Sequence, residues 1–277
     1  MTRIALGSFA NVRSRVPALC TATAHVDVAT PVVSALATVL AAPPTANLVL
    51  DFDMTDASSF TVVSGTPNVV SQITNRVSAV SWAEATNRPE FEASGLNGLP
   101  CMLANGTSHR IISTEAAVLL SNAQPYTLYY VAKHSAVRLE YVFTQARTDI
   151  GNSIRGWGQS ATTGRCRSRT VDASGTAITA EGTALATTSA HVFCWSSDGS
   201  QTRLEIDGTL AAGWPVAQAP ASLAPTRSGL FARVVNTVTD FYSGRFGAQR
   251  LYTVQHDATG RLAVARWLGA RWGIATA

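Results

Sequence analysis

Turn dipeptides that tolerate a positive backbone φ recur between short apolar runs, and this feature constrains the fold most. They are Asn97-Gly98, Asn105-Gly106, Asp198-Gly199 and Asp207-Gly208. Tight turns between antiparallel strands favour Asn-Gly and Asp-Gly, because two-residue hairpin loops need residues that accept a positive φ. We therefore expect an all-β protein built from antiparallel strands.

The runs around these turns are rich in Val, Thr, Tyr and Phe, the residues that strands favour. The runs with the length of a strand are residues 47–52, 126–132, 140–144, 190–196, 202–206, 230–235 and 241–252. Many short strands separated by turn residues are typical of a sandwich of two sheets. With a hydrophobic content of 46%, the chain has ample material for its core.

The last segment, residues 257–272, changes to a helical period. Apolar residues fall about one turn apart at Leu262, Ala265, Leu268 and Trp272. We expect the arginines between them, Arg261, Arg266 and Arg271, to face solvent. Gly273 stands where a glycine commonly ends a helix. The sequence therefore predicts a terminal amphipathic helix.

Residues 1–46 differ from the rest because they are rich in Ala, Val and Thr and end near Pro43-Pro44. We interpret them as an N-terminal arm, with a short helix after Thr30, that docks on its own domain or on other subunits. Residues 28–50 carry no charge, but the prolines interrupt them and their hydrophobicity is weak. We expect no membrane span, and we place the main domain at residues 47–277.

The charge pattern argues against nucleic acid as a partner. The formal net charge is +4, and the basic residues are scattered, apart from Arg165, Arg167 and Arg169. No stripe of basic and aromatic residues alternates as nucleic-acid binding requires.

The sequence also predicts no metal and no cofactor. The cysteines Cys20, Cys101, Cys166 and Cys194 form no C-x-x-C pair and have no histidine at metal-ligand spacing. Buried thiols, or at most one long-range disulfide, are both compatible with this spacing. The glycine-rich residues 151–158 lack the Lys-Ser/Thr of a phosphate-binding loop, and we interpret them as an ordinary loop.

Glu205 and Asp207 have the spacing of a candidate catalytic pair. On a strand they would project to the same side, about 7 Å apart. Retaining glycosidases hold two carboxyl groups about 5–5.5 Å apart. A catalytic strand of this kind would carry a further acidic residue three positions after Asp207, but that position is Leu210. Asp207 fits better as the first residue of a hairpin turn. We therefore expect no enzyme activity.

Several segments occur in the order found in one family. They are residues 87–91 (NRPEF), 96–106 (LNGLPCMLANG), 125–132 (PYTLYYVA), 203–208 (RLEIDG), 241–252 (FYSGRFGAQRLY) and 271–274 (RWGI). Over residues 47–274 the chain resembles the concanavalin A-like lectin/glucanase sandwich, and within it the laminin-G-like domains encoded by phages and prophages.

The resemblance implies a jelly-roll of two antiparallel sheets, in a family whose members bind glycans, bridge proteins or build virions. The chain departs from the phage pattern at Ala104 and Asn105, where Phe and Asp are usual. The Asp and Asn clusters that hold calcium in the family have no match here, which agrees with the prediction of no metal.

One stretch predicts a sugar site. Trp157 lies between glycines, with Asp149, Asn152 and Arg155 nearby. An exposed indole flanked by amide and guanidinium donors can stack on and hydrogen-bond a sugar. The alternative, which we favour, is that Trp157 packs over a sheet.

The leading expectation for function is a non-enzymatic structural protein of a phage particle, at the capsid surface or the tail. Its partners would be other virion proteins and further copies of itself, bound through the arm at residues 1–46. The alternative is a carbohydrate-binding module that attaches to host surface glycans. A glycoside hydrolase is the third hypothesis, and the incomplete carboxylate pair argues against it.

Overall fold

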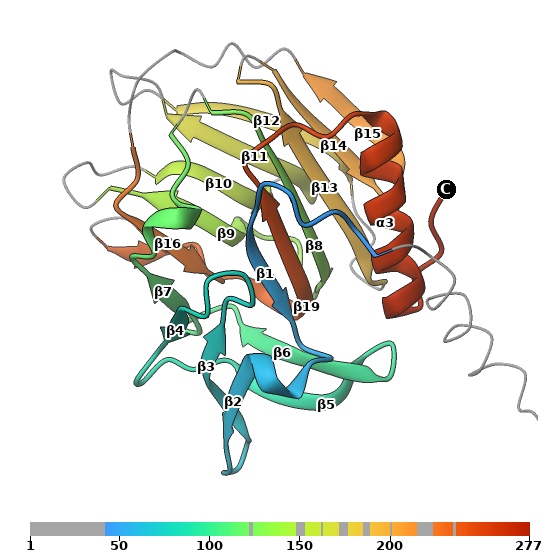
Figure 1. Ribbon diagram of the computed structural model, residues 1–277. Helices are drawn as coiled ribbons and strands as arrows, with labels where there is room; N and C mark the ends of the chain where they lie inside the picture. Colours follow the sequence, from blue (N-terminus) through green and yellow to red (C-terminus); the bar gives the residue numbers. More distant parts are fainter. Residues whose placement is uncertain are drawn as a thin grey trace, which may run out of the picture.

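The computed structural model describes residues 42–121, 124–147, 153–161, 163–171, 177–184, 189–199, 201–214, 224–234 and 237–277 (Figure 1). Almost all of the predicted arm therefore lies outside the described residues. Within them the protein is mainly antiparallel β structure and ends in a helix, α3 (Ala258–Trp272). The all-β prediction is confirmed.

The strands of the first half are β1 (Leu48–Asp53), β2 (Phe60–Val63), β3 (Val69–Thr74), β4 (Ser81–Ala83), β5 (Glu90–Leu96), β6 (Leu99–Asn105), β7 (Ile111–Ser113), β8 (Tyr126–His134) and β9 (Glu140–Ala146). Those of the second half are β10 (Ser153–Gln159), β11 (Arg165–Val171), β12 (Ala177–Ala184), β13 (His191–Ser197), β14 (Thr202–Ile206), β15 (Thr209–Trp214), β16 (Arg227–Leu230), β17 (Arg233–Val234), β18 (Val238–Thr239) and β19 (Ser243–Tyr252). Short 3₁₀ turns, η2 (Ala57–Ser59) and η3 (Ala116–Val118), follow β1 and β7.

The strands form two layers. The front sheet has the order β1-β19-β8-β13-β14-β15, and the back sheet has the order β7-β16-β9-β10-β11-β12. A continuous ladder through β6, β5, β3 and β4 joins them at one end. The predicted two-sheet, jelly-roll-like sandwich is therefore what the chain forms.

Aromatic side chains fill the space between the sheets. Trp157 of the back sheet stacks on Phe143, with ring centroids 5.4 Å apart, and meets Tyr126 of the front sheet edge-on. Tyr130 and Phe193 stack at 4.6 Å within the front sheet. Aromatic residues on alternate positions of a strand point to one side of a sheet, so the period-two pattern builds the core directly.

Two of the four turn dipeptides form tight hairpin turns as predicted, whereas at Asn105-Gly106 and Asp198-Gly199 only the glycine has a positive φ. Asn97 and Gly98 have φ of 52° and 81° between β5 and β6, and Asp207 and Gly208 have 53° and 78° between β14 and β15. A positive φ at both central residues matches the right-handed twist of the paired strands.

Helix α3 packs on the outer face of the front sheet, mainly against β13 (Figure 1). The side chain of Asp257 accepts a hydrogen bond from the Gly260 amide at the start, and Gly273 ends the helix with φ of 63°. The ring of Trp272 lies directly over Gly247, where a Cβ atom would come within 2.6 Å of it. The absence of a side chain at Gly247 thus lets the helix approach the sheet closely.

The structure corrects three expectations. Arg261 was expected to face solvent, but it is 4% exposed and lies on the side of α3 that faces the sheet, where it pairs with Glu205 of β14. Residues 151–158 were interpreted as a loop, but Ser153–Gln159 form β10. Residues 230–235 were expected to form one strand, but the chain breaks at Phe231, which has φ of 65°, and divides between β16 and β17.

The glycines explain the second error. On β10, Gly156 leaves room for the Tyr141 ring and Gly158 leaves room for the backbone of Glu140. These glycines are needed for contacts across the sheet, not for a loop, and glycine inside a strand often marks such a close approach.

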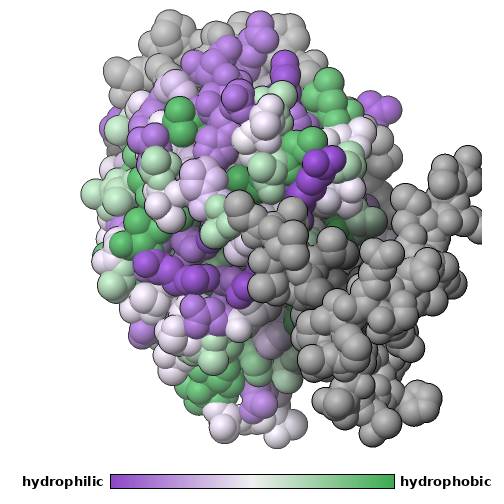
Figure 2. Space-filling view, turned by 45° about the vertical axis from the view of Figure 1, so that its right-hand side comes forward, coloured by the Kyte–Doolittle hydropathy of each residue, from purple (hydrophilic) through white to green (hydrophobic). Residues whose placement is uncertain are grey.

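Polar and apolar residues are intermixed on the face of the molecule that Figure 2 shows. Among the described residues, the large apolar side chains with high exposure come from four parts of the chain: Val63, the turn with Val77 and Val80, Val137, and Leu210. Scattered exposed apolar residues are usual on a protein surface, whereas a contiguous patch would indicate a docking site.

Candidate functional site

Trp157 and Arg155, the predicted sugar-binding residues, lie inside the sandwich. Trp157 is 1% exposed, and its Nε1 donates to the Tyr126 hydroxyl at 3.2 Å. Arg155 is fully buried; its guanidinium lies 4.7 Å from the centroid of the Tyr126 ring and donates to the Gln124 carbonyl. Burial lowers the pKa of Arg155 to about 10. Neither side chain presents a surface on which a sugar could stack, so Trp157 has the packing role.

Asp149 and Asn152, the other two predicted sugar-binding residues, lie outside the described residues. Their role stays a prediction.

Glu205 and Asp207 do not converge on an open cleft. Glu205 is 7% exposed, and its Oε1 accepts from Arg261 Nε at 2.7 Å. Asp207 accepts from the Val192 amide at 2.8 Å and lies 2.7 Å from His191 Nδ1. Each carboxylate is thus engaged with a separate part of the structure, Glu205 with the helix and Asp207 with the hairpin that it begins.

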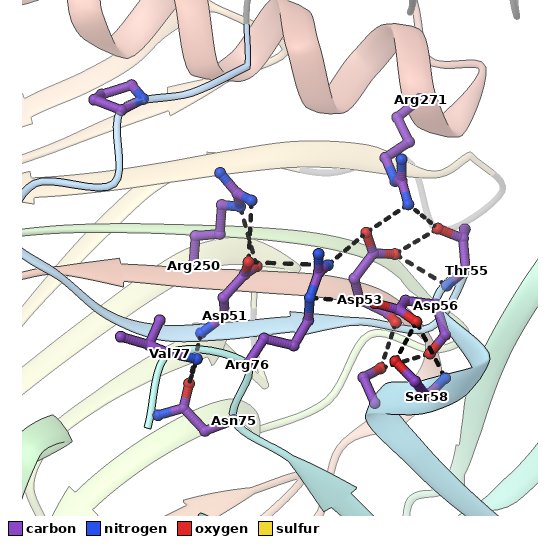
Figure 3. A network of polar contacts seen from close by, with 12 residues as sticks. Asp51, Asp53, Thr55, Asp56, Ser58, Asn75, Arg76, Val77, Arg250 and Arg271 are labelled. Atoms are coloured by element: carbon purple, nitrogen blue, oxygen red, sulfur yellow. Dashed lines mark hydrogen bonds and ion pairs between the residues drawn. The ribbon is translucent and has the colours of Figure 1, made fainter. Parts of the chain in front are cut away.

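A network of three aspartates and three arginines joins β1, β19 and the turn after β3 (Figure 3). Arg250 donates two hydrogen bonds to Asp51, both of 3.1 Å. Arg76 lies 3.9 Å from Asp51, 3.3 Å from Asp53 and 3.4 Å from Asp56. Burial raises the pKa of Asp51, although both arginines oppose the shift.

The third arginine, Arg271, ties helix α3 into this network. Its Nη2 lies 2.8 Å from Asp53 and also donates to the hydroxyl of Thr55 (Figure 3). The guanidiniums of Arg250 and Arg271 lie 4.6 and 5.5 Å from the centroid of the half-buried Trp267 ring. Because the charges balance within the network, we assign it to holding the helix on the sheet.

His134 and Glu140 form a buried pair at the end of the sandwich near β19. The Nδ1 of His134 is 2.5 Å from Glu140 Oε1, and Glu140 Oε2 accepts from the Ser243 amide at 2.8 Å. Burial raises the pKa of Glu140. The side chains are 2% and 0% exposed, so this pair has no open path to a ligand.

The cysteines in the described residues are buried free thiols: Cys101, Cys166 and Cys194. These three therefore form no disulfide with one another. Cys20 lies outside the described residues. Burial raises the pKa of Cys101 to about 12, and it also raises the pKa values of Cys166 and Cys194. Such thiols are poor nucleophiles, because the thiolate is the reactive form.

The described residues hold no group of three or more His, Cys, Asp or Glu side chains that could bind a metal ion. In the same part of the chain, no helix is both long and apolar enough to cross a membrane.

The cluster Arg165, Arg167 and Arg169, noted in the sequence, falls on alternate positions of β11. Between these arginines, Cys166 and Ser168 are buried toward the core, so the arginines point to the outer face of the back sheet. Arg165 is exposed and Arg167 is half-buried. The alternation of these arginines in the sequence is the signal that they share one face of a strand.

The outer face around Arg167 contains few other charges. Arg167 Nη2 donates to the hydroxyl of Thr179 on β12 at 3.2 Å. Glu181 is opposite Arg167 in the register, but its carboxylate accepts from Thr163 instead. Among the described residues, no carboxylate forms an ion pair with Arg165 or Arg167.

No family model matches the sequence, and no curated protein matches it. Solved structures do match the fold. A Trypanosoma rangeli sialidase in complex with sialic acid has a TM-score of 0.59 and 13% identity, and the match covers 96% of this chain and 40% of that chain. The match agrees with the β-sandwich described above.

Binding domains of two toxins share this fold. The binding domain of Paraclostridial Mosquitocidal Protein 1 has a TM-score of 0.56 and 11% identity, with 80% of this chain and 51% of that chain covered. The botulinum neurotoxin serotype G binding domain has a TM-score of 0.52 and 10% identity, with 82% and 54% covered. The chain thus spans about half or less of these three structures.

Proposed function

We propose that this chain is a carbohydrate-binding domain that attaches to glycans without cleaving them. The observation that carries the proposal is the lectin-like sandwich, which the chain shares with the two toxin binding domains over about four fifths of its length. The sialidase match leaves an enzyme as the competing hypothesis.

The carboxylates argue against the enzyme. A general acid and a nucleophile need two carboxyl groups that face the same sugar. Glu205 is held by Arg261, and Asp207 by His191 and the Val192 amide. Neither side chain is free to reach a glycosidic oxygen.

The role in a phage particle stays a prediction. It depends on the arm at residues 1–46, most of which lies outside the described residues, and none of the matched structures reported above supports it. The binding function needs only the sandwich, so we place it first.

A glycan array probed with the full chain tests the proposal, together with an assay for newly released reducing ends. We expect binding to a subset of glycans and no release. An array on which the chain binds no glycan would refute the binding function. Release of reducing ends that Glu205→Gln abolishes would instead make the protein a glycoside hydrolase.

A further inference from the structure

We infer that the outer face of β11 binds acidic polysaccharide, with Arg165 and Arg167 as the residues that contact its carboxylate or sulfate groups. This inference rests on the proposed carbohydrate-binding function and names the site and the ligand class. Arg169 lies at the next position on the same face.

The strand sets the geometry of the site. Alternate residues of a strand lie about 6.6 Å apart and point to one side, so Arg165 and Arg167 form a row parallel to β11. A linear polymer that carries repeated acidic groups can lie along such a row and meet more than one guanidinium. Guanidinium groups bind carboxylates and sulfates through paired, charge-assisted hydrogen bonds.

The neighbouring strands border this row differently. Gly156 and Gly158 of β10 are paired with Arg169 and Arg167, so β10 itself contributes no side chains on that face. The ring of Tyr141 on β9 lies over Gly156, which leaves the end of the row at Arg165 the most exposed. The β17 segment covers β9 farther along, where Thr144 Oγ1 donates to the carbonyl of Ala232.

The charge of the row is not neutralised within the described residues. Glu181 is the carboxylate nearest in register to Arg167, and Thr163 holds it at 3.1 Å. No protein carboxylate in the described residues therefore competes with an external anion for the guanidiniums of Arg165 and Arg167. Nucleic acid fits less well, because this short row offers few phosphate contacts and nucleic-acid affinity depends on many.

Binding of fluorescein-labelled dextran sulfate and polygalacturonate tests the site, with unmodified dextran as the uncharged comparison. The test variant is Arg165→Ala/Arg167→Ala. The matched control is Arg203→Ala/Arg266→Ala, which removes the same charge from two exposed positions on β14 and α3. We expect the test variant to lose at least about tenfold in affinity for one or both acidic polymers, and the control to stay within about twofold.

Glu181→Gln gives an independent readout in the opposite direction, because it removes the negative charge next to Arg167. We expect it to strengthen binding by about twofold to threefold. If the alanine variant melts at a lower temperature, Arg165→Gln/Arg167→Gln replaces it, since glutamine keeps most of the side-chain length.

Equal losses in the test and control variants would overturn the site, because general charge would then explain binding. Unchanged binding of the test variant to glycans found on the array would also overturn it, while the carbohydrate-binding function would stand. If single-stranded DNA displaces the acidic polymers from wild type at lower concentration than free dextran sulfate, the ligand class is wrong. If wild type binds no glycan at all, the proposed function itself fails.

Discussion

The two outer faces of the sandwich use arginine in different ways. On the side of the front sheet, Arg250 of β19 and Arg261 and Arg271 of α3 each form an ion pair with a carboxylate. On the back sheet, Arg165 and Arg167 form none with the described residues. The residue type is the same in both sets, so the difference in pairing comes from where each arginine lies in the fold.

Burial accounts for the pairing of Arg250 and Arg261, whose side chains are 8% and 5% exposed. An arginine that is removed from water must find a partner, because an unpaired buried charge is very costly. Arg261 meets this need with Glu205. Arg165 stays in contact with water and needs no partner within the protein. The front-face arginines therefore contribute to holding α3, whereas Arg165 and Arg167 have no ion pair with a described carboxylate that a ligand would need to displace.

We expect the largest effect on stability from disrupting the buried pair of Arg261 and Glu205. Arg261→Met leaves the Glu205 carboxylate buried without its guanidinium and should lower the free energy of unfolding by about 3–5 kcal/mol. Urea denaturation measures this. The double variant Arg261→Met/Glu205→Leu should recover most of the loss; a double variant as unstable as the single one would show that the pair is not the cause.

The contact between α3 and the sheet should give the next largest effect. Gly247→Ala places a methyl group against the Trp272 ring and should cost about 1–3 kcal/mol through overpacking. The cost should shrink in a Trp272→Phe background, where the smaller ring leaves room. Thermal unfolding of the four proteins in this cycle measures it, and an undiminished cost in the Phe background would contradict the contact.

A partly exposed pair should give a smaller, pH-dependent effect. The hydrogen bonds from Arg245 lower the pKa of Glu92, so the folded state favours its charged form. This contribution, about 0.2–1 kcal/mol, is complete above pH 4.5 and is lost as pH falls through the lowered pKa. Wild type should therefore exceed Glu92→Gln in stability at pH 7 and match it at pH 3. A difference that is constant from pH 7 to 3 would exclude this origin.

The smallest effect on stability should come from Arg165, on the outer face of β11. Arg165→Met should change the free energy of unfolding by less than about 0.5 kcal/mol, because Arg165 is exposed and has no carboxylate partner in the described residues. The same urea titration that is used for Arg261→Met provides the direct comparison. A loss similar to that of Arg261→Met would remove the distinction between the faces.

Features that depend on neighbours in the sequence could be predicted. Asp207 and Gly208 form their turn, and Asp257 and Gly273 bound α3, because each acts on backbone groups within a few residues. The strand pattern likewise follows from alternation along the chain.

Features that depend on distant partners could not be predicted. Arg261 looked solvent-facing, because its partner Glu205 is 56 residues away. Gly156 looked like part of a loop, because the Tyr141 ring that requires it lies on another strand. The period of two at Arg165, Arg167 and Arg169 was visible in the sequence, but the pairing of this strand with the glycines of β10 was not.

The account depends most on the contrast between arginines with and without a carboxylate partner. Arginine modification by phenylglyoxal measures this contrast directly in the unmutated protein. Peptide mass spectrometry gives a rate for each residue with and without dextran sulfate. We predict that Arg165 and Arg167 react faster than Arg250 and Arg261, and that dextran sulfate slows only the first two. Equal rates for Arg165 and Arg261, or no protection of Arg165 and Arg167 by the polymer, would contradict the account.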